Sequence, residues 1–270
     1  MSGKSSAPPS STIKIKRVNR LFWDIETSPN VVYSWRCGPK VHISHDNIIK
    51  ERAIICICWK WEHEEEVHAL TWDDNQCDRA MLEAFLVVAK QADELVAQNG
   101  DRFDIKWFNT RCMYHRLEAI GDWKTVDTLK MAKSKQYFNS NRLDYMGKFL
   151  FNEGKIDVGF DLWKAICENN DPIALKTMVD YCRRDVGLLQ EVWEVLSRYT
   201  KPRTHVGVHN KGEKWSCPYT GSENVEFSKK LTTAAGTVQY RMHSPDAEAY
   251  YTISQKSFHD YLEAKAEANE

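Results

Sequence analysis

An eight-residue stretch, Arg20–Thr27, reads RLFWDIET and decides the fold. It is apolar, short and rich in β-forming residues, and it stops at the turn signal Ser28-Pro29-Asn30, so we expect a strand that ends abruptly. Two acids, Asp24 and Glu26, interrupt it. Because side chains two residues apart in a strand point to the same face, both carboxylates should project together.

An acid pair on a strand most often faces solvent at the edge of a sheet. Here the two acids stand among Leu21, Phe22, Trp23 and Ile25. An apolar strand is a costly place for two unpaired anions, and a bound cation removes that cost. The context therefore favours a metal site.

The pattern around this strand predicts an α/β fold, a mixed sheet flanked by helices. Further strands are expected at Ala53–Glu62, Val67–Trp72, Glu94–Gln98 and Thr125–Leu129. Helices are expected at Cys77–Ala92, from Asp101 onward, near Asn141–Phe151 and Phe160–Asn169, and at Ile173–Tyr199, where Asp171 and Pro172 mark the start.

The composition divides the chain into three parts. Residues 1–11 are polar and small, which predicts a disordered leader. Residues 12–200 form the predicted α/β domain. Beyond Lys201 the periodicity fades, so residues 201–270 are expected to form a separate basic module with an acidic tail.

Two more acidic motifs follow in the chain. Asp104 ends the stretch Asn99–Asp104 (NGDRFD), at the end of a predicted strand and the beginning of a helix. Tyr181 and Asp185 lie in YCRRDV, and their four-residue spacing puts both on one helix face. Taken alone, Asp104 would be an acid at the start of a helix, stabilised by the helix dipole. Asp185 would be an exposed acid paired with a nearby arginine.

In this order, the motifs WDIET, NGDRFD and YCRRDV resemble those of the DEDD superfamily of 3′-5′ exonucleases. That superfamily has the ribonuclease-H-like fold, and the tyrosine places the resemblance in its DEDDy subclass. Between Leu21 and Tyr199 the sequence is similar in particular to YprB-type ribonuclease-H-like domains and to the proofreading domains of family B polymerases.

The resemblance implies hydrolysis of phosphodiester bonds with two Mg²⁺ or Mn²⁺ ions about 4 Å apart. By the same resemblance Asp24 bridges both ions, Glu26 and Asp185 complete the ion that activates water, and Asp104 holds the second ion. Tyr181 would orient the attacking water rather than serve as the base, because a phenol has a pKa near 10. Substrate contacts are expected at two further residues, Thr27 and Asn99, both of which also have ordinary roles in turns.

The segment after Lys201 resembles a zinc ribbon that has lost its ligands. Cys217-Pro218 remains, whereas Thr220, Met242 and Pro245 stand where cysteines are expected. One cysteine cannot hold tetrahedral zinc, and His205, His209 and His243 match no common spacing. We therefore predict no zinc. Tyr219, Phe227 and Tyr240 lie among lysines and could stack on single-stranded bases.

Composition limits the class of protein. The 270 residues carry 37 Lys and Arg against 38 Asp and Glu, which excludes a polycation. Any surface that binds nucleic acid must therefore be a local positive patch. The longest apolar run, Ala53–Trp59, is far below the roughly 20 residues of a membrane span. Eight cysteines without a C-x-x-C pair suit small buried side chains in a reducing, cytoplasmic setting.

The expected partner is nucleic acid with a free 3′ end, preferably single-stranded DNA, with no membrane. A replication or repair partner is possible. An RNA-processing exonuclease or endonuclease would use the same centre. A catalytically idle nucleic-acid-binding or replication-scaffold protein is the alternative of another class, although all four acids and the tyrosine are present.

Overall fold

The central strand of the larger unit is β1, Arg20–Thr27, with the bounds that the sequence predicts. The computed structural model describes residues 17–38, 40–118, 122–152 and 159–268. The predicted leader, residues 1–11, lies outside these ranges. Residues 19–203 form one compact unit, and residues 204–268 belong to a second.

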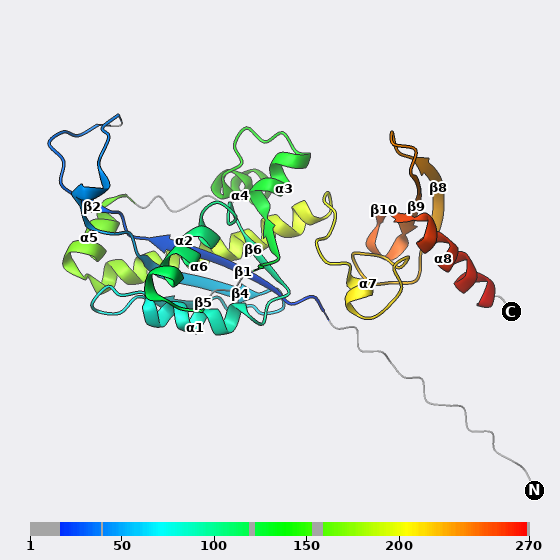
Figure 1. Ribbon diagram of the computed structural model, residues 1–270, viewed down its shortest axis with the longest axis horizontal. Helices are drawn as coiled ribbons and strands as arrows, with labels where there is room; N and C mark the ends of the chain where they lie inside the picture. The colour runs from blue at the N-terminus through cyan, green and yellow to red at the C-terminus, as the bar shows by residue number, and fades with distance from the viewer. Residues whose placement is uncertain (1–16, 39, 119–121, 153–158, 269–270) are drawn as a thin grey trace, which may run out of the picture. The chain divides into compact units, whose positions relative to one another are not determined.

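The larger unit is built on a five-stranded sheet in the order β5-β4-β1-β6-β7 (Figure 1). On one side of β1, β4 (Ile54–Trp61) pairs antiparallel with β1 and β5 (His68–Thr71) pairs antiparallel with β4. On the other side, β6 (Glu94–Ala97) and β7 (Thr125–Asp127) run parallel to β1. The fold is therefore the expected mixed sheet with flanking helices.

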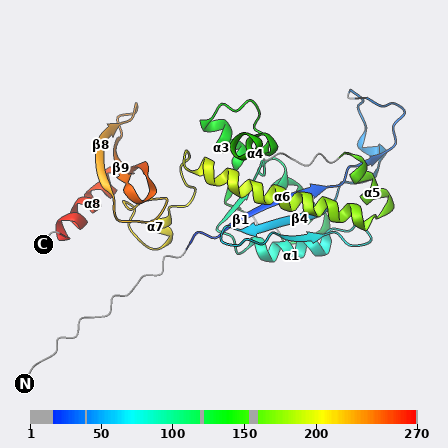
Figure 2. The ribbon, with the colours of Figure 1, turned by 180° about the vertical axis from the view of Figure 1, so that it is seen from behind.

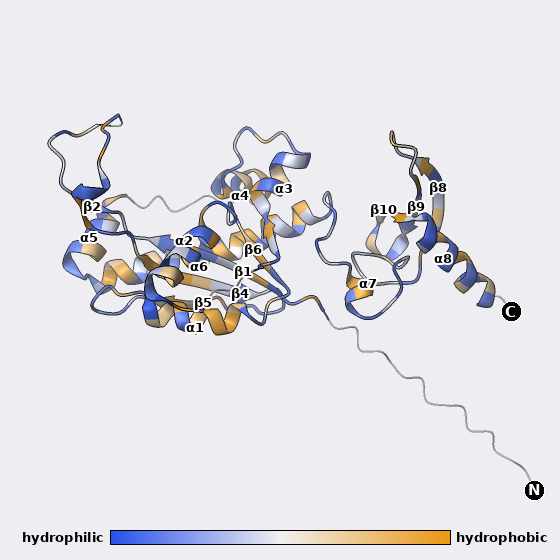
Figure 3. Ribbon diagram, viewed as in Figure 1, coloured by the Kyte–Doolittle hydropathy of each residue, from blue (hydrophilic) through white to orange (hydrophobic). Residues whose placement is uncertain are grey.

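One face of the sheet is covered by α1 (Arg79–Ala89) and α2 (Asp104–His115). Helix α1 is largely hydrophobic in Figure 3, and its Met81, Leu82, Phe85 and Leu86 are buried. Trp23 of β1 is fully buried on this face, stacked on Phe85 with ring centroids 5.1 Å apart and edge-on to Phe108.

A buried ionic network ties these helices to the sheet. Asp78, immediately before α1, is 0% exposed, and its Oδ2 accepts hydrogen bonds from the Ile54 N–H (2.9 Å) and from Arg111 Nε (2.7 Å). Its Oδ1 lies 2.6 Å from His115 Nε2. The hydrogen bonds from Arg111, Ile54 and His115 outweigh the burial of Asp78 and hold the pKa of its carboxyl below the usual range.

The opposite face of the sheet is covered by α6 (Pro172–Ser197), which crosses it in Figure 2. The predicted start is confirmed, because the Asp171 side chain accepts hydrogen bonds from the N–H groups of Ile173 and Ala174, and Pro172 is the first helical residue. Phe22 of β1 is buried on this face. Asp24 and Glu26 follow Phe22 at two-residue spacing and share its face.

The remaining elements of the larger unit include two expected helices, α4 (Leu143–Phe151) and α5 (Asp161–Asn169). The strand expected over 125–129 stops at Asp127, because the side chain of Asp127 caps a helix that the sequence analysis missed, α3 (Thr128–Lys135). Between β1 and β4 the chain also forms a small sheet of β2 (Val31–Val32) and β3 (Ile48–Lys50), with the 3₁₀ turn η1 (His45–Asn47) before β3.

The second unit has a three-stranded antiparallel sheet in the order β10-β9-β8. Its elements are α7 (Val206–His209), β8 (Glu226–Thr232), β9 (Val238–Ser244), the 3₁₀ turn η2 (Pro245–Ala247), β10 (Ala249–Ser254) and α8 (Gln255–Glu267). The last two form much of the segment expected to be an acidic tail. A separate core, which includes Trp215, Cys217 and Met242, holds this unit together.

None of the described helices is long and apolar enough to cross a membrane.

Candidate functional site

Asp104 is joined to the acidic strand by a hydrogen bond. Strand β6 pairs with β1 only as far as Phe22 and Val96, so the N–H of Ile25 lies beyond the paired region. The Oδ1 atom of Asp104, the first residue of α2, accepts this N–H at 3.2 Å. The Asp104 side chain thus satisfies a backbone N–H of β1 that has no strand partner in β6.

The turn between β6 and α2 explains two residues of the second motif. Asn99 adopts a left-handed conformation with φ of 60°, which asparagine tolerates better than most residues. A Cβ on Gly100 would lie 2.5 Å from the Cβ of Ala97, so this position needs glycine. The turn brings the chain from β6 into α2 with Asp104 directed at β1.

Three of the predicted acids surround the fourth, Asp24. Burial raises the pKa of Asp24 well above its ordinary value, and the negative charges of Asp104, Glu26 and Asp185 raise it further. The structure therefore brings together acids from β1, α2 and α6 that are up to 161 residues apart in the sequence.

Asp104 is only 1% exposed. Burial raises the pKa of its carboxyl to about 7, although hydrogen bonds from its own N–H and that of Ile25 act in the opposite direction. A fifth acid, Asp127, contributes a further increase through its charge.

Asp127 is an acid whose link to the site the sequence analysis missed. Its Oδ1 accepts hydrogen bonds from the N–H groups of Asn99, Leu129 and Lys130, so that Asp127 caps α3. Its Oδ2 is buried and has no hydrogen-bond partner among the described residues. The strand-ending position of Asp127 beside β6 was the available signal, because parallel strands end at the same edge of a sheet.

Tyr181 lies one helical turn before Asp185 on α6, is 6% exposed and belongs to the core between α6 and the sheet. Thr27 is buried at the end of β1, where its carbonyl accepts a hydrogen bond from Trp163 Nε1 at 3.1 Å.

A cleft of about 470 Å³ opens beside Asp185. Asp185 and Asn99 are the two predicted site residues that line this cleft. The remaining lining residues come from the end of β6, the start of α3 and the approach to α4: Gln98, Leu129, Asn141, Arg142, Leu143 and Asp144. Gln98 fixes the wall, since its Nε2 donates to the carbonyl of Asn141 at 2.8 Å.

The donor set fits hard divalent cations. Carboxylate oxygens are the ligands that Mg²⁺ and Mn²⁺ prefer. Burial and the repulsion of neighbouring carboxylates both raise the pKa of Asp24, and a bound cation would relieve this repulsion. Asp24, Glu26, Asp104 and Asp185 could therefore hold such ions.

The model of one protein family, RNase_H_2 of the RNase_H superfamily, matches residues 50–197, more than half of the chain. The chain belongs to the RNase_H superfamily. Membership of this superfamily supports nuclease activity in general, and its nucleases generally use divalent metal ions. The matched region contains Asp104, Tyr181 and Asp185, whereas Asp24 and Glu26 precede it.

Among solved structures, the chain is similar to the family B DNA polymerase from the hyperthermophilic archaeon Pyrobaculum calidifontis, with a TM-score of 0.51 and 14% identity. The similarity covers 77% of this chain and 26% of the polymerase chain, so this chain spans about a quarter of the polymerase. It supports the RNase_H-superfamily fold. No curated protein sequence matches the chain.

Proposed function

We propose that the chain is a metal-dependent 3′-5′ exonuclease of the DEDDy type that acts on single-stranded nucleic acid, DNA by preference. The observation that carries this proposal is the meeting of Asp104, Glu26 and Asp185 around Asp24. Like charges in a partly buried site are unfavourable unless a cation is bound there, and carboxylates with divalent ions are the usual means of phosphodiester hydrolysis.

Each acid has a separate task in this proposal. The charges of the other three acids all act on Asp24, and such a central carboxylate is suited to be a ligand shared by two ions. Glu26 and Asp185 would complete one ion site and Asp104 the other. When bound, the two Mg²⁺ or Mn²⁺ ions would lower the pKa of a water molecule and stabilise charge on the leaving 3′ oxygen.

The protein groups position the reactants. Tyr181, packed in the core and one turn from Asp185, would orient the attacking water through its hydroxyl. Asp104 is held by the Ile25 N–H, so its carboxylate cannot rotate freely away from β1. Such pre-arranged groups reduce the entropy lost when the reacting geometry forms.

The cleft beside Asp185 is proposed to hold the terminal nucleotide. The polar side chains of Asn99, Asn141 and Arg142 line it. The segment from Thr128 to Arg142, which reaches this wall, has four basic residues and no acid. Tyr137 in this segment is fully exposed, and an exposed ring among cations suits stacking on a base of single-stranded nucleic acid.

The second unit is proposed to bind substrate as well. Strand β8 is largely exposed and carries Phe227, Lys229 and Lys230. Phe227 is 46% exposed and lies against Phe258, with ring centroids 5.0 Å apart. Truncation after Arg203 should raise KM and lower the salt dependence of binding while kcat changes little. An unchanged KM would remove this unit from the substrate site.

The activity is tested with oligonucleotides labelled at the 5′ end, so that 3′-5′ degradation gives a ladder of shortened labelled products. Single-stranded DNA, single-stranded RNA and duplex DNA are compared in Mg²⁺, in Mn²⁺ and in chelator. Exonuclease action predicts a ladder with single-stranded DNA that chelator abolishes. Faster RNA degradation would favour RNA processing, and internal cuts in a circular substrate would show an endonuclease.

Binding without any cleavage would favour the catalytically idle scaffold protein.

Arg142→Ala and Tyr137→Ala test the proposed cleft: each should raise KM, and Arg142→Ala should reduce the slope of log K against log salt by about 0.7 for one lost phosphate contact. Lys90→Ala, at the end of α1 and paired with Glu118, is the matched control and should leave both unchanged.

A further inference from the structure

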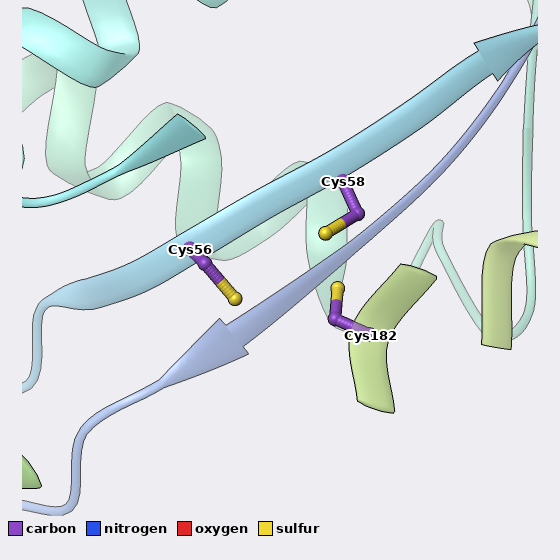
Figure 4. A group of neighbouring side chains, drawn as sticks. All are labelled: Cys56, Cys58 and Cys182. Carbon is purple, nitrogen blue, oxygen red and sulfur yellow. The ribbon is translucent and has the colours of Figure 1, made fainter. Parts of the chain in front are cut away.

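Three buried cysteines, from β4 and α6, lie close together in the core on the face of the sheet that α6 covers. Cys56 and Cys58 lie two residues apart on β4 and therefore share a face, and Cys182 comes from α6. Each is 0% exposed, and their Sγ atoms all lie within 4.8 Å of one another. Figure 4 shows the Cys56 and Cys58 side chains leaving β4 on the same side, with the sulfur atoms of Cys58 and Cys182 near each other.

This spacing is close to that of thiolates around a single ion. With metal–sulfur bonds of about 2.3 Å, three sulfur ligands of one ion are separated by about 4 Å. The sulfur atoms of Cys56, Cys58 and Cys182, all within 4.8 Å of one another, are close to this separation. Thiolate ligands select soft and borderline cations, whereas Mg²⁺ and Mn²⁺ prefer oxygen.

The cysteine cluster touches the acidic site at one residue. The Sγ atom of Cys182 lies 3.6 Å from Oδ2 of Asp24 and 3.6 Å from its carbonyl oxygen. In the β1–β4 ladder, Asp24 pairs with Cys58 and Glu26 with Cys56. Because Asp24 is partly exposed and the thiols are not, its carboxylate marks the side from which an ion could enter.

We propose that Cys56, Cys58 and Cys182 form a binding site for a thiophilic divalent cation of the Zn²⁺ and Cd²⁺ class, with the Asp24 carboxylate as a fourth, oxygen ligand. Binding replaces the thiol protons with the cation, so protons are released to solvent and no electron is transferred. Four ligands of this kind satisfy the tetrahedral preference of zinc. This site is distinct from the ribbon positions near Cys217, to which the prediction of no zinc applies.

Occupation of the cysteine site should inhibit hydrolysis, an effect that rests on the proposed nuclease function. Asp24 is the shared ligand of the proposed hard-ion centre. A carboxylate drawn toward a sulfur-bound cation is lost to that centre. The cysteine cluster would then make the enzyme sensitive to thiophilic metals.

Binding is tested on the full-length chain, freed of metal and kept reduced with a non-thiol reductant. Titration with Cd²⁺ should produce the ultraviolet thiolate charge-transfer band, saturating at one ion per chain. Mg²⁺ should produce no such band, and Cd²⁺ should protect the wild type from thermal unfolding to the extent of this binding. Absence of a saturable band in the wild type would overturn the site without recourse to any variant.

Variants identify the ligands. Cys58→Ala and Cys182→Ala should each lower the band by about one third and weaken Cd²⁺ binding about tenfold or more, since even indirect partners of metal ligands contribute that much. Cys112→Ala is the matched control, because Cys112 is buried in the same unit but packs on the opposite face of the sheet. An undiminished band in Cys182→Ala would overturn the assignment.

Activity is measured separately. Micromolar Zn²⁺ added to the Mg²⁺ reaction should slow the wild type and Cys112→Ala, and should leave Cys182→Ala at its own uninhibited rate. Cd²⁺ binding at full intensity with no inhibition by Zn²⁺ would overturn the link through Asp24. A protein without any Mg²⁺-dependent cleavage would overturn the proposed function, while the thiolate band would still decide the cysteine site.

Discussion

The backbone N–H of Ile25 donates a hydrogen bond to Oδ1 of Asp104 over 3.2 Å, across a sequence separation of 79 residues. Ile25 stands between Asp24 and Glu26, so this bond fixes the second acidic motif against the middle of the first. Asp104 therefore has a structural task in addition to its proposed role as a metal ligand.

Asp24→Asn should abolish hydrolysis while the fold is retained. The carboxylate proposed to serve both ions is lost, and this removes several kcal/mol of transition-state stabilisation, about three orders of magnitude in rate or more. The same change should raise the Tm of the metal-free protein, because it removes a carboxyl group whose charged form is disfavoured by burial and by the neighbouring acids. Turnover near the wild-type value, with circular dichroism unchanged, would contradict the assigned site.

The metal-free protein should lose stability as the pH rises through the range from about 4 to 7. Asp24 and Asp104 have folded-state pKa values above the ordinary value of 3.8, the latter at about 7. Between the unfolded and folded pKa the native state binds more protons, so the free energy of unfolding falls with rising pH. Urea unfolding at several pH values measures this. Mg²⁺ should remove most of the loss, and an identical slope with and without Mg²⁺ would count against ion binding by these acids.

Tyr181→Phe should slow hydrolysis by about 10- to 1,000-fold, which corresponds to about 1.4 to 4 kcal/mol. The variant removes one hydroxyl and keeps the ring in the core. The Mg²⁺ concentration for half-maximal activity should stay unchanged, which separates orientation of water from metal binding. Tyr114→Phe, at an exposed position of α2, is the control and should keep the full rate. If Tyr181→Phe were as inactive as Asp24→Asn, the Tyr181 hydroxyl would do more in hydrolysis than orient the water.

Asp78→Ala should destabilise the protein by about 3 to 5 kcal/mol, because it leaves the buried Arg111 guanidinium without its partner. The folded-state pKa of Asp78 lies below the ordinary value of 3.8, so its contribution is fully present above pH 4 and disappears as the pH falls through the lowered pKa. The difference between wild type and variant in denaturant titrations should shrink only in acid. Glu83→Ala, which breaks the exposed pair with Arg79, should cost less than about 1 kcal/mol.

The C-terminal unit should hold no zinc. Cys217 is buried in its core, and Thr220, Met242 and Pro245 supply no adequate ligands. Elemental analysis of the wild type and Cys217→Ala should give the same zinc content, whatever the cysteine cluster of the larger unit retains. Loss of one zinc per chain in Cys217→Ala, together with unfolding of this unit, would show a replacement site that uses the histidines.

Local patterns predicted the elements that carry their own signals. Strand β1 has an apolar run with a turn signal at its end, and α6 has Asp171 and Pro172 at its start. Helix α3 was missed because its cap, Asp127, also ends a strand, and the lysines that follow give a weak apolar pattern. Helix α8 was missed because residues 242–270, with six acids and two lysines, have a composition typical of a tail as well as of an exposed helix face.

The site was predictable only where motifs mark it. The acids of WDIET, NGDRFD and YCRRDV could be named, since each motif combines an acid with a distinctive local context. The charge of Asp127 beside Asp104, the cleft wall at Asn141–Asp144 and the meeting of Cys182 with β4 could not be named. These relationships depend on which strands are neighbours and on how α6 crosses the sheet, and sequence spacing alone does not contain that information.

The interior position of β1 also determines how the site responds to fluctuations. Strand β1 pairs with β4 as far as Thr27 and with β6 as far as Phe22, and it is buried under α1 and α2 on one face and α6 on the other. Backbone amides in such a strand exchange their hydrogens with solvent only through the largest openings of a protein. Asp24 and Glu26 are therefore carried by a segment that does not fray, and hydrogen exchange there should report global unfolding rather than the opening of a lid.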